Sequence, residues 1–121
     1  MNENPYLAAL ARVQMHSGTS GQAALAKCIL SLYNDFYAFS ASDYLPSLDR
    51  EGRELVINMI TSYARDGETQ ELRIAGKWCY ENLPRLVELA RAMSEARTEV
   101  YRQWEYEREE ELNHLYPHDE S

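Results

Sequence analysis

The sequence predicts an all-α protein, a small bundle of four to five helices with a long C-terminal helix that projects from it. Apolar residues recur at helical spacing in four separate stretches of the chain. Typical helix starts and stops divide these stretches: an Asn or Asp cap, an early proline, or a closing glycine. Residues 85–116 contain neither glycine nor proline, so one helix can continue through the whole segment.

The length and composition are those of a single domain. The chain has 121 residues, of which 45% are hydrophobic and 26% are charged. That is enough apolar surface for one core, and too short a chain for separate catalytic and regulatory modules. We therefore divide it into one helical domain over residues 1–104 and an acidic helix extension and tail over residues 105–121.

The first half of the chain predicts two helices and an aromatic connection. Asn4 followed by Pro5 is a cap followed by a first-turn proline, and it predicts a helix from Pro5 to Met15. After a Gly- and Ser-rich loop at 16–21, apolar residues at helical spacing predict a second, mostly buried helix that ends at Asn34. The aromatic segment 36–39 is the only one with a strand-like pattern.

The second half predicts two or three more helices. Asp49 as a cap and Gly67 as a stop bound a third helix over about 49–64, and residues 69–84 form one helix or two, since Gly76 permits a break. Asn82 before Pro84 predicts another cap and the start of the last helix. At 1.5 Å per residue this helix is about 50 Å long, whereas a small domain is only about 30 Å across. Its end is therefore expected to project.

The charge of the chain argues against two classes of partner. Lys and Arg number 12 and Asp and Glu number 20, which gives a net charge of -8. This charge opposes direct binding of nucleic acid or of an anionic membrane. No apolar run approaches the roughly 18 residues of a membrane span, and the first residues lack the basic region of a secretory signal. We expect a cytoplasmic protein with neither kind of partner.

Residues with catalytic or metal-binding potential are few. Cys28 and Cys79 lie among apolar and aromatic neighbours, which predicts buried free thiols, with a disulfide between them as the alternative. Glu111 and His114 have the spacing found in di-metal bundles, but the required second motif is missing. His16 beside Ser17 fits a loop at a helix end better than a nucleophile and its base. We therefore predict no catalytic residue, cofactor or metal, and a protein that is not an enzyme.

The last helix carries the strongest functional signal. Its tyrosines and tryptophan alternate with carboxylates, which suits an interface of apolar anchors with a charged rim. Core packing of Tyr101 and Trp104 and a merely solvated acidic helix end are the alternatives. The candidate partner-binding residues are Tyr101, Trp104, Glu105, Tyr106, Glu107, Glu109, Glu110 and Glu111.

Short strings in the first two thirds of the chain carry a resemblance. They are Ser20-Gly21-Gln22, Leu32-Tyr33-Asn34, Phe39, and the stretch from Leu45 to Leu48-Asp49. With these strings the chain resembles a family of small uncharacterised proteins of proteobacterial plasmids, integrative elements and phages, over about residues 17–78. The resemblance implies a mobile-element context and assigns no activity and no catalytic residues. The acidic helix after Pro84 lies outside it.

Two functions from different classes follow. The first is a non-enzymatic interaction module, an accessory or anti-defence inhibitor of a mobile element, whose acidic last helix docks on a basic protein surface. Where that surface normally binds nucleic acid, the carboxylates would mimic phosphates. The alternative is a self-associating structural or regulatory protein that forms a homodimer through the last helix and buries Met93, Tyr101 and Trp104 across a two-fold axis.

Overall fold

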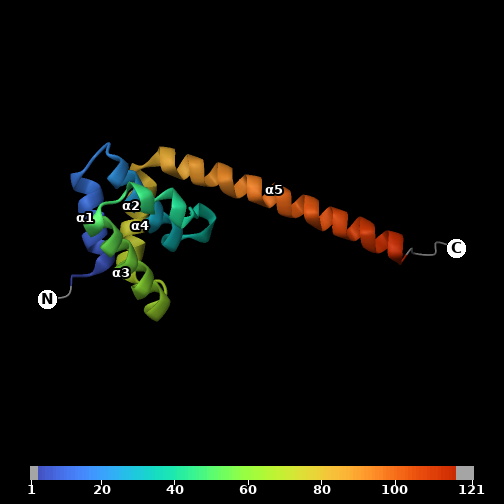
Figure 1. Cartoon of the computed structure of the whole chain (residues 1–121), viewed down its shortest axis with the longest axis horizontal. Coiled ribbons are helices and arrows are strands. Elements are labelled where there is room, and N and C mark those ends of the chain that lie inside the picture. The colour runs from blue at the N-terminus through green and yellow to red at the C-terminus, as the bar shows by residue number, and fades with distance from the viewer. Residues whose placement is uncertain (1–2, 117–121) are drawn as a thin grey trace.

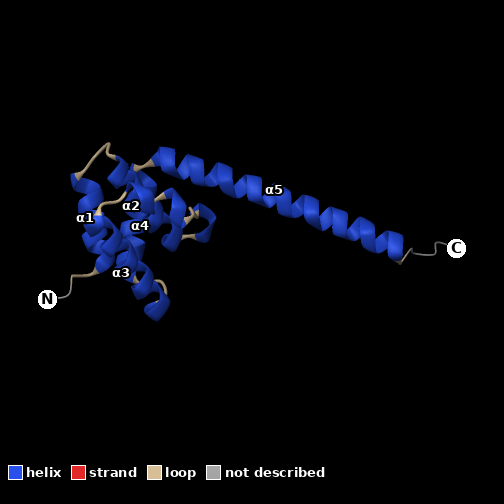
Figure 2. Ribbon diagram, in the orientation of Figure 1, coloured by secondary structure: helices blue, strands red, loops and turns tan. Residues whose placement is uncertain are grey.

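The structure is a computed structural model that describes residues 3–116, and within this range it contains helices and turns but no strand. Figures 1 and 2 show a cluster of helices from which one long helix extends. The all-α prediction is therefore confirmed. The α-helices are α1 (Pro5–Met15), α2 (Ser20–Tyr33), α3 (Arg50–Asp66), α4 (Gln70–Asn82) and α5 (Pro84–Leu115). Three short 3-10 helices connect α2 to α3, and they are η1 (Asp35–Tyr37), η2 (Ala41–Asp43) and η3 (Leu45–Ser47).

The helix ends lie close to where the sequence places them. The Asn4 side chain accepts hydrogen bonds from the backbone N–H groups of Tyr6 and Leu7 at 2.9 and 3.2 Å, and so caps α1. Asp49 caps α3 by accepting from the Gly52 N–H at 2.8 Å. Gly67 ends α3 with a φ of 69°, a conformation that other residues rarely adopt. These three signals satisfy backbone groups that a helix end leaves unpaired.

The core lies between α1, α2, α3 and α4. Its largest fully buried side chains include Tyr6, Leu30, Met59 and Leu72, one from each of these helices. The Tyr6 hydroxyl donates to the Met59 carbonyl at 3.3 Å and satisfies its polar group inside the core.

The two cysteines belong to this core. Cys28 and Cys79 are fully buried and form no disulfide, as the composition of their neighbours predicts. Burial raises the pKa of each thiol to about 12. Both therefore act as small apolar side chains.

Residues 70–82 form one helix, although Gly76 permitted a break. A Cβ atom at this position would overlap the ring of Tyr33 on α2. The glycine therefore serves the close packing of α2 against α4 and does not end a helix.

Two predictions in the connecting segments are wrong. Residues 36–39 form no strand, because their backbone groups are satisfied locally: Asn34 accepts from the Phe36 N–H at 2.9 Å, and Ser31 Oγ accepts from the Phe39 N–H at 2.8 Å. Asn82 is not a cap for α5. It lies in the last turn of α4, where its amide donates to the Trp78 carbonyl at 2.9 Å.

None of the described helices combines the length and the apolar character needed to cross a bilayer.

Candidate interaction surface

The first half of α5 is anchored on the bundle by one face. Val87, Ala90 and Ser94 are buried and lie three and four residues apart, so they share one side of the helix. Ser94 Oγ donates a hydrogen bond to the Phe36 carbonyl, and Arg97 Nη2 donates to the Ala38 carbonyl at 3.3 Å. The segment around η1 therefore fixes α5 as far as Arg97.

An aromatic cluster completes this anchor. The ring centroids of Phe36 and Tyr37 lie 5.3 Å apart, and those of Tyr37 and Tyr80 lie 5.6 Å apart. The hydroxyl groups of Tyr37 and Tyr80 raise the pKa of the Arg91 guanidinium, which α5 places beside them. Side chains from η1, α4 and α5 thus meet at the start of the long helix.

Beyond Arg97 the helix leaves the bundle (Figure 1). Every residue from 98 to 116 is exposed. Among the described residues, no hydrogen bond or ion pair joins this segment to another element, and its side-chain contacts stay within the helix. At 1.5 Å per residue the projecting part is about 28 Å long.

The aromatic candidates are on this projecting part. Tyr101 is 60% exposed and Trp104 is 59% exposed, and their rings pack against each other with centroids 5.5 Å apart. Core packing of these two residues, the alternative left open by the sequence, is therefore wrong. The other exposed apolar side chains of the segment are Val100, Tyr106, Leu112, Leu115 and Tyr116.

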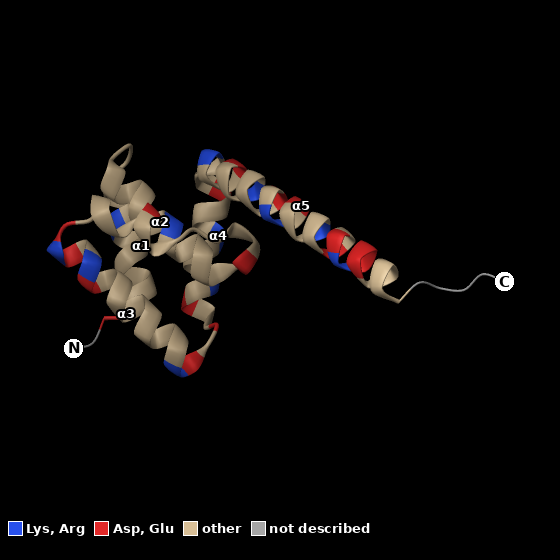
Figure 3. Ribbon diagram, turned by 45° about the vertical axis from the view of Figure 1, so that its right-hand side comes forward, with Lys and Arg blue, Asp and Glu red and all other residues tan. Residues whose placement is uncertain are grey.

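The acidic candidates surround the helix near its end. Figure 3 shows the acidic residues gathered there, whereas both charges alternate closer to the bundle. We call Glu105, Glu107, Glu109, Glu110 and Glu111 the tip glutamates. Within the described part of the chain none of them forms an ion pair. Successive helical residues are rotated by about 100°, so these five side chains point to all sides of the axis.

The sequence reasoning overlooked a second apolar face on α5. Leu89, Met93, Ala96 and Val100 follow one another at intervals of four, three and four residues, so they form one stripe. This stripe borders the buried face, because Met93 is partly buried against the core, whereas Leu89 and Val100 are 46% and 43% exposed. The spacing alone predicts the stripe, whereas only the fold shows that most of it is exposed.

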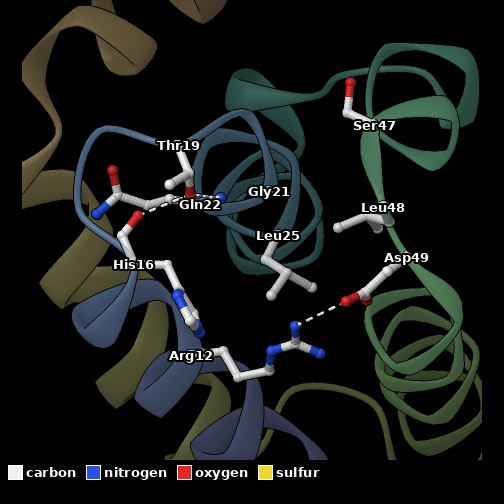
Figure 4. A pocket seen from close by; sticks show the side chains of 9 residues that line it. All are labelled: Arg12, His16, Thr19, Gly21, Gln22, Leu25, Ser47, Leu48 and Asp49. Carbon is white, nitrogen blue, oxygen red and sulfur yellow. Dashed lines mark hydrogen bonds and ion pairs between the residues drawn. The ribbon is translucent and has the colours of Figure 1, made fainter.

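A cavity of about 280 Å³ lies between the α1–α2 turn and the start of α3 (Figure 4). Its charged groups are paired, because Arg12 contacts Asp49 at 3.2 Å. The Thr19 hydroxyl is also occupied: it donates to the His16 carbonyl at 2.7 Å and caps α2. Ser17 does not line this cavity. His16 follows the last residue of α1 as its C-cap, which agrees with the prediction of a loop residue at a helix end.

Glu111 and His114 lie in the exposed last turns of α5. Within residues 3–116 no group of three or more His, Cys, Asp or Glu side chains is arranged to hold a metal ion. These two residues therefore have no further ligand beside them in the described chain.

The chain was compared with families of proteins, with curated proteins and with solved structures, and none of the three comparisons finds a match.

Proposed function

We propose that this protein is a non-enzymatic interaction module whose projecting α5 segment binds a protein partner with a basic surface. One observation carries the proposal: residues 98–116 extend away from the bundle and expose aromatic, aliphatic and acidic side chains together. Large apolar side chains in contact with water are unfavourable, at roughly 25 cal/mol per Å². Their accumulation on a helix with no bundle contacts is typical of a binding surface.

The two kinds of side chain would contribute differently to binding. Trp and Tyr are the residues that most often carry binding energy, because they bury a large rigid surface. The surrounding carboxylates would attract a partner rich in Lys and Arg and would speed its association. Because this attraction is screened, binding is expected to weaken as the salt concentration rises.

The mobile-element resemblance supports a specific form of this function. In that form the protein is an accessory or anti-defence inhibitor, and its partner uses the same basic surface to bind nucleic acid. The tip glutamates, which cover about 10 Å along the axis of the projecting helix, could then occupy a site meant for phosphates.

The test is capture of partners from a bacterial lysate treated with nuclease, followed by mass spectrometry. The variant carries glutamine at all five tip glutamates. A matched control carries glutamine at five exposed or partly exposed positions of the bundle and its N-terminal segment: Glu3, Glu51, Glu54, Glu68 and Glu81. Both variants lose the same charge, so a general effect of net charge would appear in both.

We expect the control and the unchanged protein to retain the same basic protein, and the tip variant to lose it. Equal retention by the tip variant would contradict the proposal. Loss of capture by both variants would also contradict it, because the attraction would then come from the net charge and not from α5.

A further inference from the structure

The second apolar face of α5 has the pattern of a helix-pairing seam. Leu86, Leu89, Met93, Ala96 and Val100 are spaced three, four, three and four residues apart, which is the alternation of a heptad repeat. We call these five residues the seam. Leu86 and Met93 are partly buried against the core, whereas Leu89, Ala96 and Val100 are exposed. The bundle therefore leaves most of the seam uncovered.

An apolar cavity lies at the foot of the same helix. It has a volume of about 310 Å³ and is located where α4 turns into α5 and meets the first turn of α2. We call it the elbow cavity. Its lining residues include Ala23, Leu83, Pro84, Arg85 and Leu86. Leu86 thus belongs to both features, and the seam leads directly into the cavity.

We propose that two copies of the chain pair through antiparallel α5 seams and that Trp104 of each copy enters the elbow cavity of the other. The apolar positions of a heptad are called a and d, and here Leu86, Met93 and Val100 are a positions, whereas Leu89 and Ala96 are d positions. In an antiparallel pair an a position of one helix packs beside a d position of the other. This places Leu89 opposite Val100 of the second copy and Met93 opposite Ala96. Large side chains then meet smaller ones, which allows the helices to approach closely.

The position of the cavity agrees with this register. When Leu89 faces Val100 of the other copy, residue 104 lies level with residue 85 along the helix axis. Trp104 flanks the seam on the same side as Leu83 of the other copy, which lines the elbow cavity, so its exposed indole arrives at the opening. The elbow cavity and Trp104 are far apart in the sequence. The register that brings them together follows from the spacing of the seam residues alone, without reference to the cavity.

The charge distribution of α5 allows a second copy as the occupant and favours the antiparallel arrangement. Residues 86–103 contain three acidic side chains, Glu88, Glu95 and Glu99, and three basic ones, Arg91, Arg97 and Arg102. Two such segments can approach without net repulsion. Residues 104–116 contain the five tip glutamates and a single arginine, Arg108. A parallel pair would bring these acidic ends together, whereas the antiparallel pair separates them.

This inference goes beyond the proposed function and does not depend on it. The dimer uses the seam and buries Trp104, so a basic partner would bind the dimer through the tip glutamates and the exposed tyrosines Tyr101 and Tyr106. The two proposals can therefore fail separately.

The first test is the mass of the full chain by light scattering across a concentration series. We expect a mass that rises to twice the 14.0 kDa of one chain. Val100→Glu, a change at an exposed seam residue, is expected to give the monomer mass. Ile57→Glu, at an exposed position of α3, is the matched control and should leave the dimer intact. A mass that stays at 14.0 kDa up to about 0.5 mM would overturn the proposal, and so would an unchanged dimer in Val100→Glu.

The second test measures the direction of pairing by the distance between two spin labels. A label at Glu110→Cys lies near the exposed end of α5, and the two native cysteines are buried and therefore protected from labelling. The antiparallel register predicts a separation of about 46 Å between the two labels. A separation below about 20 Å, which a parallel pair would give, would overturn it.

The third test concerns the elbow cavity. Trp104→Ala is expected to weaken dimerisation by about tenfold or more, since it removes a large aromatic anchor. Tyr116→Ala removes an exposed aromatic residue outside the contact and should leave the affinity unchanged. Equal dimerisation of both variants would exclude the cavity as the docking site of Trp104. The tip-glutamate variant should dimerise normally, so loss of its partner would concern the proposed function alone.

Discussion

The bundle and the projecting part of α5 use the same kinds of residue in opposite ways. In the bundle, aromatic and aliphatic side chains such as Tyr6 and Leu72 are fully buried. On the projecting helix, Tyr101, Trp104 and Leu112 remain in contact with solvent. Burial of apolar surface stabilises a fold, whereas exposed apolar surface adds nothing to it. Apolar burial in the bundle therefore explains why the chain folds, whereas the exposed apolar side chains of α5 beyond Arg97 have no role in folding and need another explanation.

The connection between the two regions is narrow. Three buried side chains of α5, two partly buried ones, and the hydrogen bonds of Ser94 and Arg97 join the helix to the bundle. The remainder of α5 is held straight by its own backbone hydrogen bonds and by its high content of Glu, Arg, Leu and Ala, which favour helices. A rigid arm on a short anchor suits the presentation of a surface to a partner.

The largest expected difference between the two regions is in the free energy of unfolding, when a leucine is replaced by alanine in each of them. Leu72→Ala removes a fully buried side chain and should lower the free energy of unfolding by about 2–5 kcal/mol. Leu112→Ala, at a residue that is 46% exposed, should change it by less than about 0.5 kcal/mol. Chemical denaturation of dilute protein gives both values. A large loss for Leu112→Ala would mean that the end of α5 contributes to folding.

The next effect concerns the close packing inside the bundle. Gly76→Ala places a methyl group in the Tyr33 ring and should destabilise the fold by about 1–3 kcal/mol. Gly21→Ala is the control, because the nearest atom to its Cβ is 3.9 Å away and alanine favours a helix. Thermal unfolding should therefore show a lower midpoint for Gly76→Ala only. If both variants behaved alike, the contact between α2 and α4 would be looser than described.

A smaller effect is expected at the anchor. Ser94→Ala leaves the Phe36 carbonyl without its hydrogen bond and should cost about 0.5–1.5 kcal/mol, located where η1 meets α5. Hydrogen exchange should become faster in residues 84–97 and stay unchanged in α1. Thr98→Ala is the control, since the Thr98 hydroxyl bonds only within α5, to the Ser94 carbonyl at 2.9 Å. Uniformly faster exchange through the bundle would contradict a local anchor.

The smallest effect is the pH dependence of one cap. Hydrogen bonds from the Gly52 N–H and from Arg12 hold the pKa of Asp49 below its ordinary value of 3.8. Because the folded pKa is the lower one, Asp49 stabilises the fold above this value, and the contribution disappears as the pH falls through the folded pKa. Asp49→Asn keeps a capping side chain without the charge. Between about pH 5 and pH 2, the free energy of unfolding of Asp49→Asn should therefore fall less than that of the unchanged protein. An identical acid dependence would exclude a contribution from this carboxylate.

Local signals explain most of what could be predicted from the sequence. Caps and stops such as Asn4, Asp49 and Gly67 act on the nearest turn, so their effect does not depend on distant parts of the chain. The strand-like segment 36–39 was misjudged because its backbone is satisfied by side chains of Ser31 and Asn34, which a pattern of aromatic residues does not reveal. The contact between Ser31 and Phe39 forms only because the chain turns back along α2 after Asn34.

The candidate site was harder to predict for a related reason. The alternation of aromatic residues and carboxylates singled out the last helix, and Tyr101 and Trp104 are exposed on its projecting part. The periodicity of α5 fits two apolar faces, one with Val87 and Ala90 and one with Leu89 and Val100. Which of them contacts the bundle is decided by η1, an element that the sequence did not predict. The uncovered seam therefore became visible only in the fold.

The most direct measurement of the central claim is site-specific photo-crosslinking in a bacterial host. A photoreactive phenylalanine replaces Tyr106 on the projecting helix in one variant and Ile57 on α3 in another, and both positions are exposed. If α5 is the binding surface, position 106 should form covalent adducts with a protein partner and position 57 should form none. Adducts at position 57 alone, or adducts at neither position, would contradict the claim that this protein acts through α5.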